Sequence, residues 1–263
     1  MEQPYRVVDD VFVLPSSETA PGHGVLPVNA YLVAARSPIL IDTGLAMESE
    51  AFLKSLWSLV DPEDLGWVLL THEDPDHAGN LLAVLERASQ ARLVVNYVTL
   101  GKLLEAFSIS LERVVVVNPG GRVPGLERAL TVLRPPVYDS PGTIGFHDAA
   151  TGVLFTVDAF GTYLPELVAD LAELDDDDAL RTGLADFNRA NHPWVTLAEP
   201  SRFASILGDL ARLEPTVLLS SHGVPARGRA QALLDAMAAL PTMEPYVPPD
   251  QERFEQLRPE MGP

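Results

Sequence analysis

The fold of this chain is decided by one polar stretch that lies between two apolar ones. It reads Thr71-His72-Glu73-Asp74-Pro75-Asp76-His77-Ala78-Gly79-Asn80. The apolar run Trp67–Leu70 before it predicts a buried strand, and Ala78–Arg87 after it has the spacing of a helix. Loops at the carboxyl end of a buried strand carry the sites of α/β sheets, because the strand holds them rigidly. We therefore expect an α/β protein with its site in this loop.

Residues of the types that bind metals are concentrated in this stretch. Two of the six histidines of the chain, His72 and His77, fall here within six positions. In an extended loop the side chains of His72, Asp74 and Asp76 can converge, while His77 turns to the opposite side as the helix begins. That arrangement suits two adjacent metal ions better than one. Glu73, between the candidate ligands, is expected to point outward.

The pattern His72-x-Asp74-x-Asp76-His77 resembles the His-x-His-x-Asp-His motif of the metallo-β-lactamase superfamily, with a carboxylate at the second position. A carboxylate there is typical of the flavodiiron proteins and of their stand-alone relatives, the oxygen-binding diiron proteins. Those proteins normally have Glu at this position, whereas this chain has Asp. The resemblance implies an α/β metallo-β-lactamase fold, a four-layer αββα sandwich, with a two-metal site.

Segments on both sides of the motif extend the resemblance over about residues 5–235, in the order that the family has. Val28–Leu32 and Ile39–Gly44 are similar to the two early strands of the superfamily. In the second of them the family has an aspartate, here Asp42, that braces the metal loop by hydrogen bonds. Asp42 is therefore expected to support the ligands without being one.

Two later segments carry the remaining part of the resemblance. Gly152–Gly161 ends in Asp-Ala-Phe-Gly, as in the diiron branch, and the aspartate of that element, here Asp158, is implied to bridge both metals. Ser220-Ser221-His222-Gly223 matches the late Ser-His-Gly element of the family. Its histidine, here His222, is implied to complete the second metal.

The chain departs from its apparent relatives at the third ligand of the first metal. The relatives have a histidine shortly before a Pro-Gly pair, and the matching stretch here is Val137-Tyr138-Asp139-Ser140-Pro141-Gly142. Asp139 is the candidate ligand, and the other interpretation makes it a turn residue that leaves the site incomplete. His147 is the alternative donor. His192 and Trp194 are interpreted as parts of core or helix packing.

The complete set of candidate ligands comprises three histidines and four carboxylates: His72, Asp74, Asp76, His77, Asp139, Asp158 and His222. Four carboxylates balance the charge of two divalent cations, and hard oxygen ligands shift the preference from zinc toward iron or manganese. We expect two Fe ions, with Mn or Zn as the alternatives. No catalytic residue beyond the metal ligands and no organic cofactor site is expected.

Three classes of function are compatible with such a site. With iron, the resemblance implies that the protein binds or reduces O₂ or NO. With zinc or manganese, hydrolysis of an ester, lactone or phosphoester is the alternative, and a sensor module without catalysis is the third. Only about twenty residues follow the last expected helix, too few for a flavodoxin-like domain. Electrons would then come from a separate donor protein or from another subunit, and a homodimer remains an open alternative.

Composition excludes several partners. The formal net charge of −19 would repel nucleic acids and anionic lipid surfaces. The acidic run Asp175–Asp178 is interpreted as a solvated helix end or loop. The chain contains no cysteine, which excludes disulfides and thiolate metal sites. It has neither a secretion leader nor an apolar run long enough to span a membrane, so a cytoplasmic protein is expected.

The expected organisation is one metallo-β-lactamase-like domain over residues 1–240, followed by a Pro-rich tail over residues 241–263. Pro119-Gly120-Gly121 is the candidate seam between two halves of similar plan. Helical stretches are expected from about Tyr163 to Leu213.

Overall fold

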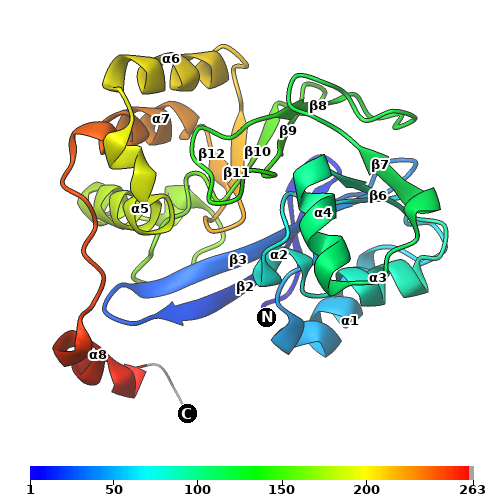
Figure 1. Ribbon diagram of the computed structural model, residues 1–263, viewed down its shortest axis with the longest axis horizontal. Helices are drawn as coiled ribbons and strands as arrows, with labels where there is room; N and C mark the ends of the chain where they lie inside the picture. Colours follow the sequence, from blue (N-terminus) through cyan, green and yellow to red (C-terminus); the bar gives the residue numbers. More distant parts are fainter. Residues whose placement is uncertain (261–263) are drawn as a thin grey trace. The chain divides into compact units, whose positions relative to one another are not determined.

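The structure is a computed structural model, and it describes residues 1–260 (Figure 1). The chain forms two compact units. Unit 1 consists of Met1–Ser16, Val28–Pro135 and Ser140–Thr151, and unit 2 of Ser17–Pro27, Pro136–Asp139 and the described residues from Gly152 onward. The predicted seam at Pro119-Gly120-Gly121 lies inside unit 1. The division falls later than predicted, because the strand pair that follows this seam belongs to unit 1.

The strands form two sheets, of seven and five strands. The seven-stranded sheet has its strands in chain order, which are β1 (Tyr5–Val8), β2 (Val11–Ala20), β3 (Gly24–Val33), β4 (Ile39–Ile41), β5 (Trp67–Leu69), β6 (Arg92–Val95) and β7 (Val114–Val116). Strands β4 to β7 run parallel. Parallel strands align their carboxyl ends at one edge, and Asp42 and the loop Thr71–His77 follow β4 and β5 there.

The helices of unit 1 are α1 (Ser49–Leu59), α2 (Pro75–Ala78), α3 (Leu81–Arg87) and α4 (Tyr97–Ala106), and short 3₁₀ turns precede α1 and β7 at Ala46–Glu48 and Leu111–Arg113. Apolar side chains of α1 and α3, such as Phe52, Leu56 and Val84, share one buried core with those of β5 and β6. The helix predicted over Ala78–Arg87 is split into α2 and α3. Asn80 interrupts it with φ −112° and ψ 12°, because its side chain donates to the carbonyl of Thr43 at 2.7 Å.

In unit 1, β8 (Leu130–Leu133) pairs antiparallel with β9 (Gly145–Asp148). In unit 2, β10 (Val153–Val157) pairs parallel with β11 (Val217–Ser220), which pairs antiparallel with β12 (Ala226–Arg227). The strands β10 and β11 are buried throughout, and they end directly before Asp158 and Ser221-His222. Both carboxyl ends therefore present candidate ligands.

Unit 2 contains four helices among its described residues. They are α5 (Asp177–Asn191), α6 (Pro200–Ala211), α7 (Ala230–Ala238) and α8 (Gln251–Leu257), with 3₁₀ turns at Leu171–Glu173, Pro193–Leu197, Leu240–Thr242 and Arg258–Glu260. Figure 1 shows α5, α6 and α7 packed together. The acidic run forms the start of α5, where Asp176 accepts from the backbone of Asp178 and Ala179. The helical prediction from Tyr163 was wrong for residues 163–170, which bend around an isolated bridge between Leu164 and Val25.

The C-terminal segment packs on unit 2 as far as the structure describes it. Glu260 accepts a hydrogen bond from the backbone of Gly22 at 2.9 Å, and Leu257 is buried. The ring of His23 stacks on Tyr163 with 4.5 Å between centroids, and its Nε2 lies 3.2 Å from the hydroxyl of Tyr246. Residues 261–263 of the predicted tail lie outside the described residues. None of the helices within residues 1–260 is both long and apolar enough to cross a membrane.

Two helix glycines of unit 2 give a matched test of this packing. A Cβ on Gly183 in α5 would collide with the carbonyl of Tyr163, whereas on Gly208 in α6 it would meet only the Arg212 side chain at 3.7 Å. We expect Gly183→Ala to lower the free energy of unfolding by about 1 to 3 kcal/mol. Gly208→Ala should raise it by about 0.5 to 1 kcal/mol, since alanine is the better helix former. Urea denaturation midpoints measure both, and equal shifts would contradict the close approach at Gly183.

Candidate metal centre

Four of the predicted ligands come together in the loop between β5 and α2. The rings of His72 and His77 lie 4.0 Å apart between centroids. The Nε2 atom of His72 is 3.6 Å from a carboxylate oxygen of Asp74, and that of His77 is 3.5 Å from one of Asp76. Both imidazoles are buried, while the side chain of Asp74 is 44% exposed. The loop thus offers two imidazole–carboxylate pairs with their donor atoms side by side.

Asp42 holds this loop from the end of β4. Its carboxylate accepts the backbone N–H of Thr71 at 2.9 Å and the Thr71 hydroxyl at 2.8 Å, and it lies 2.8 Å from Nδ1 of His77. An imidazole that donates from Nδ1 to a carboxylate directs its Nε2 lone pair at a metal. The residue has φ 60°, in the left-handed region that aspartate tolerates better than most residues. The predicted bracing role of Asp42 is observed within unit 1.

Glu73 points away from the ligand pairs, as predicted. It forms an ion pair with Lys102 and accepts the hydroxyl of Ser140 at 2.8 Å. Burial raises the pKa of Glu73, but the hydrogen bonds from Lys102 and Ser140 outweigh it, so this pKa lies below its ordinary value. The neighbouring imidazole of His72 likewise lowers the pKa of Asp74. Both carboxyl groups are therefore ionised at neutral pH, and only Asp74 is turned toward the imidazoles.

In unit 2, Asp158 and His222 follow the paired strands β10 and β11. The Oδ1 atom of Asp158 lies 3.5 Å from Nε2 of His222, whose Nδ1 is 3.0 Å from the carbonyl of Pro27. Val157 has φ 59°, and its carbonyl accepts from the Ser220 hydroxyl and the Ser221 backbone, both at 2.8 Å. Asp158 and His222 thus form a third imidazole–carboxylate pair, again with Nδ1 anchored and Nε2 available to a metal.

Asp139 lies in a cluster of unit 2 in which two members, Asp139 and Asp158, were predicted ligands and the third, His192, was not. Asp139, Asp158 and His192 each offer one ligand atom, and these atoms all lie within 4.8 Å of one another. His192 is fully buried at the end of α5. The predicted packing role of His192 is observed in its contact with Phe187, and its place beside two carboxylates was not predicted. The only signal in the sequence was that a histidine stands at a helix end before a proline, and that pattern does not indicate a partner.

His147, the alternative donor, lies in β9 of unit 1. It is buried, and burial lowers the pKa of its imidazole. Within residues 1–260 it belongs to none of the clusters of three or more His and carboxylate donors. The choice between Asp139 and His147 as a ligand stays a prediction.

The family follows from a comparison with known proteins. Residues 23–240 match the model of the metallo-beta-lactamase superfamily, which covers most of the chain. The chain belongs to the metallo-β-lactamase superfamily. The predicted fold class, an α/β metallo-β-lactamase fold, is thereby confirmed, and the structure has the mixed α/β content and two sheets of that fold.

Within the metallo-β-lactamase superfamily, the relatives are flavodiiron proteins and diflavin flavoproteins, which confirms the predicted branch. Diflavin flavoprotein A 1 of Synechocystis sp. is 30% identical over 145 residues, which make up 54% of this chain and 25% of that protein. A flavo-diiron protein of Clostridium acetobutylicum is 32% identical over 68 residues, 26% of this chain and 17% of that protein. The chain spans about a quarter or less of the length of these two relatives.

Solved structures agree with this fold. Rubredoxin oxygen:oxidoreductase from Desulfovibrio gigas superposes with a TM-score of 0.80 at 20% identity, covering 92% of this chain and 62% of that one. The flavodiiron protein from Giardia intestinalis gives 0.77 at 18% identity, with 91% and 59% covered. At such identities the likeness concerns the fold of this superfamily member alone.

The donors present in this superfamily member fit transition-metal ions. Each unit by itself places imidazole nitrogens beside carboxylates. In His77 and His222, Nδ1 is hydrogen-bonded to oxygen and Nε2 is directed at the neighbouring carboxylate. Nitrogen and oxygen donors of this kind suit iron, manganese and zinc. Thiolate ligands are absent because the chain has no cysteine.

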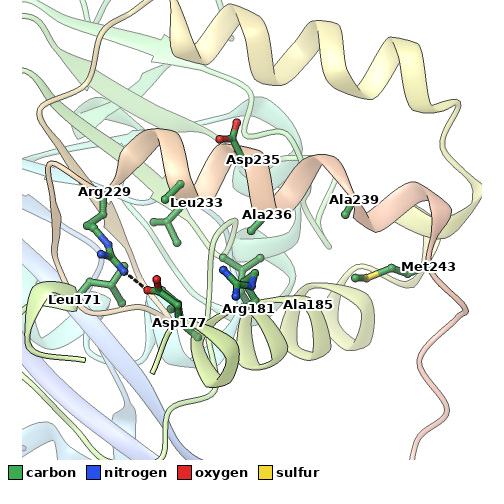
Figure 2. Close-up of a pocket in the computed structure, with 13 residues that line it drawn as sticks. Leu171, Asp177, Arg181, Ala185, Arg229, Leu233, Asp235, Ala236, Ala239 and Met243 are labelled. Atoms are coloured by element: carbon green, nitrogen blue, oxygen red, sulfur yellow. Dashed lines mark hydrogen bonds and ion pairs between the residues drawn. The ribbon is translucent and has the colours of Figure 1, made fainter. Parts of the chain in front are cut away.

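The groove of unit 2 between α5 and α7 is a separate feature. It has a volume of about 430 Å³ and is lined by apolar residues such as Leu233 and Met243, with an ion pair between Arg229 and Asp177 at 2.6 Å (Figure 2). None of the candidate metal ligands lines it. This groove is therefore not part of the candidate metal centre.

Proposed function

We propose that this chain holds two iron ions and binds or reduces O₂ or NO at them. The first ion is assigned the ligands His72, Asp74, Asp139 and Asp158. The second is assigned Asp76, His77, Asp158 and His222, with Asp158 shared. The proposal requires the ligand pairs of unit 1 and those of unit 2 to act on the same two ions, as the family resemblance implies.

The observation that carries the proposal is the carboxylate at position 74 beside a buried imidazole. Nε2 of His72 lies 3.6 Å from Asp74, so this position supplies a hard, negatively charged oxygen donor where the superfamily motif has a third imidazole. Oxygen donors raise the preference for iron or manganese over zinc, and four carboxylates offset the charge of two divalent ions. This donor set favours redox chemistry over zinc-type hydrolysis.

Two ferrous ions would supply one electron each, either to one bound O₂ molecule or to a pair of NO molecules. The chain itself contributes position and environment. Asp42 fixes the ring of His77, and the carbonyl of Pro27 fixes that of His222, so each Nε2 keeps its direction. Burial of His72, His77 and His222 excludes water from behind the ligands.

The name of the Desulfovibrio gigas protein, rubredoxin oxygen:oxidoreductase, supports oxygen as the reactant. The matched region makes up only part of each relative, so the relatives do not identify the electron donor of this chain. We propose a separate electron-donor protein or another subunit in that role. A homodimer, one domain over residues 1–240, and a cytoplasmic location stay predictions.

The test loads the full chain with Fe²⁺ without oxygen and then adds O₂. We expect about two Fe per chain, a new optical absorption band or O₂ consumption on mixing, and no substantial β-lactam hydrolysis. Zinc-loaded protein is the matched control, because Zn²⁺ has no redox chemistry and should give no band. Unchanged spectra of the iron form, together with rapid hydrolysis of an ester by the zinc form, would instead assign the protein to the hydrolases.

A further inference from the structure

The cluster of Asp139, Asp158 and His192 lies entirely in unit 2 and surrounds one polar hydrogen-bond donor. The side-chain amide nitrogen of Asn191 is 3.4 Å from Oδ2 of Asp139, 3.4 Å from Oδ2 of Asp158 and 3.5 Å from Nε2 of His192. Two carboxylates and one imidazole therefore converge on a group with partial positive charge. The position that this amide nitrogen takes has the surroundings that a cation prefers.

The backbone fixes His192 in this direction. It follows α5 as its C-cap residue, with φ −123° and ψ 62°, and its N–H donates to the carbonyl of Asn188 at 3.0 Å. Pro193 comes next and cannot continue the helix hydrogen bonding. The ring of Phe187 meets that of His192 edge to face at 6.3 Å between centroids and lies 5.2 Å from that of His222. An apolar ring thus contacts the imidazoles of both His192 and His222.

Hydrogen bonds join the segments that carry the two carboxylates to the end of α5 and the turn after it. Trp194, two residues after His192, donates from its ring nitrogen to the carbonyl of Tyr138, the residue before Asp139, at 2.9 Å. Asn188 donates to the carbonyl of Gly161 at 2.9 Å, and Gly161 donates to the carbonyl of Asp158 at 2.9 Å. The three ligand atoms therefore belong to segments of unit 2 that are hydrogen-bonded to one another.

The geometry suits a single metal ion after small side-chain movements. Bonds of about 2.0 to 2.2 Å from an ion to nitrogen and oxygen donors place two donors at most roughly 4.4 Å apart. The three atoms of the cluster already lie within 4.8 Å of one another. Two carboxylates and one neutral imidazole balance a divalent charge, and this mixture of donors suits iron and manganese.

We propose that His192 is a ligand of the first metal ion. In this assignment, which rests on the proposed dinuclear site, the imidazole that the family has at the position of Asp139 comes instead from the end of α5. Asp139 contributes an oxygen beside it, and the Asn191 amide turns aside when the ion binds. With His192 in place of the histidine that the family has at position 139, the first metal keeps two imidazole ligands, His72 and His192.

The test uses Co²⁺ and the full chain, with His192→Leu and His192→Gln as variants and His23→Leu as the matched control. Binding titrations give the affinity and number of ions, and proton NMR of the Co²⁺ form counts the shifted, exchangeable imidazole N–H signals. We expect two ions and four such signals in the wild type. Both His192 variants should show three signals and an affinity at least tenfold lower for one ion, while His23→Leu should match the wild type.

Other outcomes overturn the inference in distinguishable ways. Two ions bound with unchanged affinity in both His192 variants would reject His192 as a ligand and leave the dinuclear site intact. Weaker binding with all wild-type signals retained would make it a positioning residue. Loss of a signal in His147→Leu, with none lost in the His192 variants, would assign the donor to His147. A wild-type chain that binds no Co²⁺ would reject the dinuclear site itself.

Discussion

Replacing Asp158 by alanine should remove stable binding of both metal ions, from about two per chain to nearly none. Asp158 is buried beside His222 and Asn191, and it is assigned to both ions. Loss of its carboxylate would deprive each ion of a ligand and would leave the site with one negative charge fewer. Changing groups that merely support a ligand typically costs about 10- to 100-fold in affinity, so removing a shared ligand should cost more at both sites.

The measurement is the metal-to-protein ratio of chains loaded with Fe²⁺ under argon and then dialysed. Asp170→Ala is the matched control, since Asp170 is a buried aspartate of the same unit that caps a 3₁₀ turn and pairs with Arg227 at 3.1 Å. It should lower stability and keep both ions. Full occupancy of both positions in Asp158→Ala would show that Asp158 does not bridge, and loss of one ion alone would assign it to a single metal.

Asp42→Ala should weaken both the metal-free fold and the metal site. The change leaves the Thr71 N–H and hydroxyl and Nδ1 of His77 without the carboxylate that they contact in the core. Burying a polar group without a hydrogen-bond partner costs about 1 to 3 kcal/mol. Thr71 and His77 each lose such a partner in this variant. Release of the His77 ring should also lower metal affinity by about 10- to 100-fold.

Denaturant unfolding of the metal-free chain measures the first effect, and metal titration measures the second. Asp42→Asn is the control, because an amide of the same shape still offers one accepting oxygen. It should fall between the wild type and Asp42→Ala in both measurements. An unchanged free energy of unfolding in metal-free Asp42→Ala would contradict the bracing role seen in unit 1.

The loop of ligands could be predicted because its signals are local. Thr71–His77 lies between an apolar strand and a helix, and the spacing of its two histidines and two aspartates is legible without a structure. Asp42 could be predicted as a brace because Ile39–Gly44 resembles the early strand of the superfamily whose aspartate has that role. The strands β10 and β11 were predicted from their apolar runs, and the roles of Asp158 and His222 at their ends were predicted from the resemblance to the family.

The features that were missed depend on contacts between residues distant in sequence. His192 meets Asp139 and Asp158 only because a helix end and two loops pack together, and the pattern around it indicates only that a helix stops. The break between α2 and α3 arises from the contact of Asn80 with Thr43. The bend at residues 163–170 depends on the pairing of Leu164 with Val25. None of these contacts has a periodic signal in its own segment.

Val157, at the end of β10, has a backbone conformation that lowers stability and that also orients the neighbouring Asp158. A β-branched residue with φ 59° is a backbone outlier, and such conformations cost about 1 to 3 kcal/mol. This strained residue directly precedes Asp158, whose carboxylate lies beside His222. The Val157 carbonyl accepts two hydrogen bonds, and these bonds hold the bend. Glycine would relieve the strain and also free the turn. Selection for thermal stability alone would therefore favour Val157→Gly, and the Asp158 carboxylate would then lose its fixed orientation.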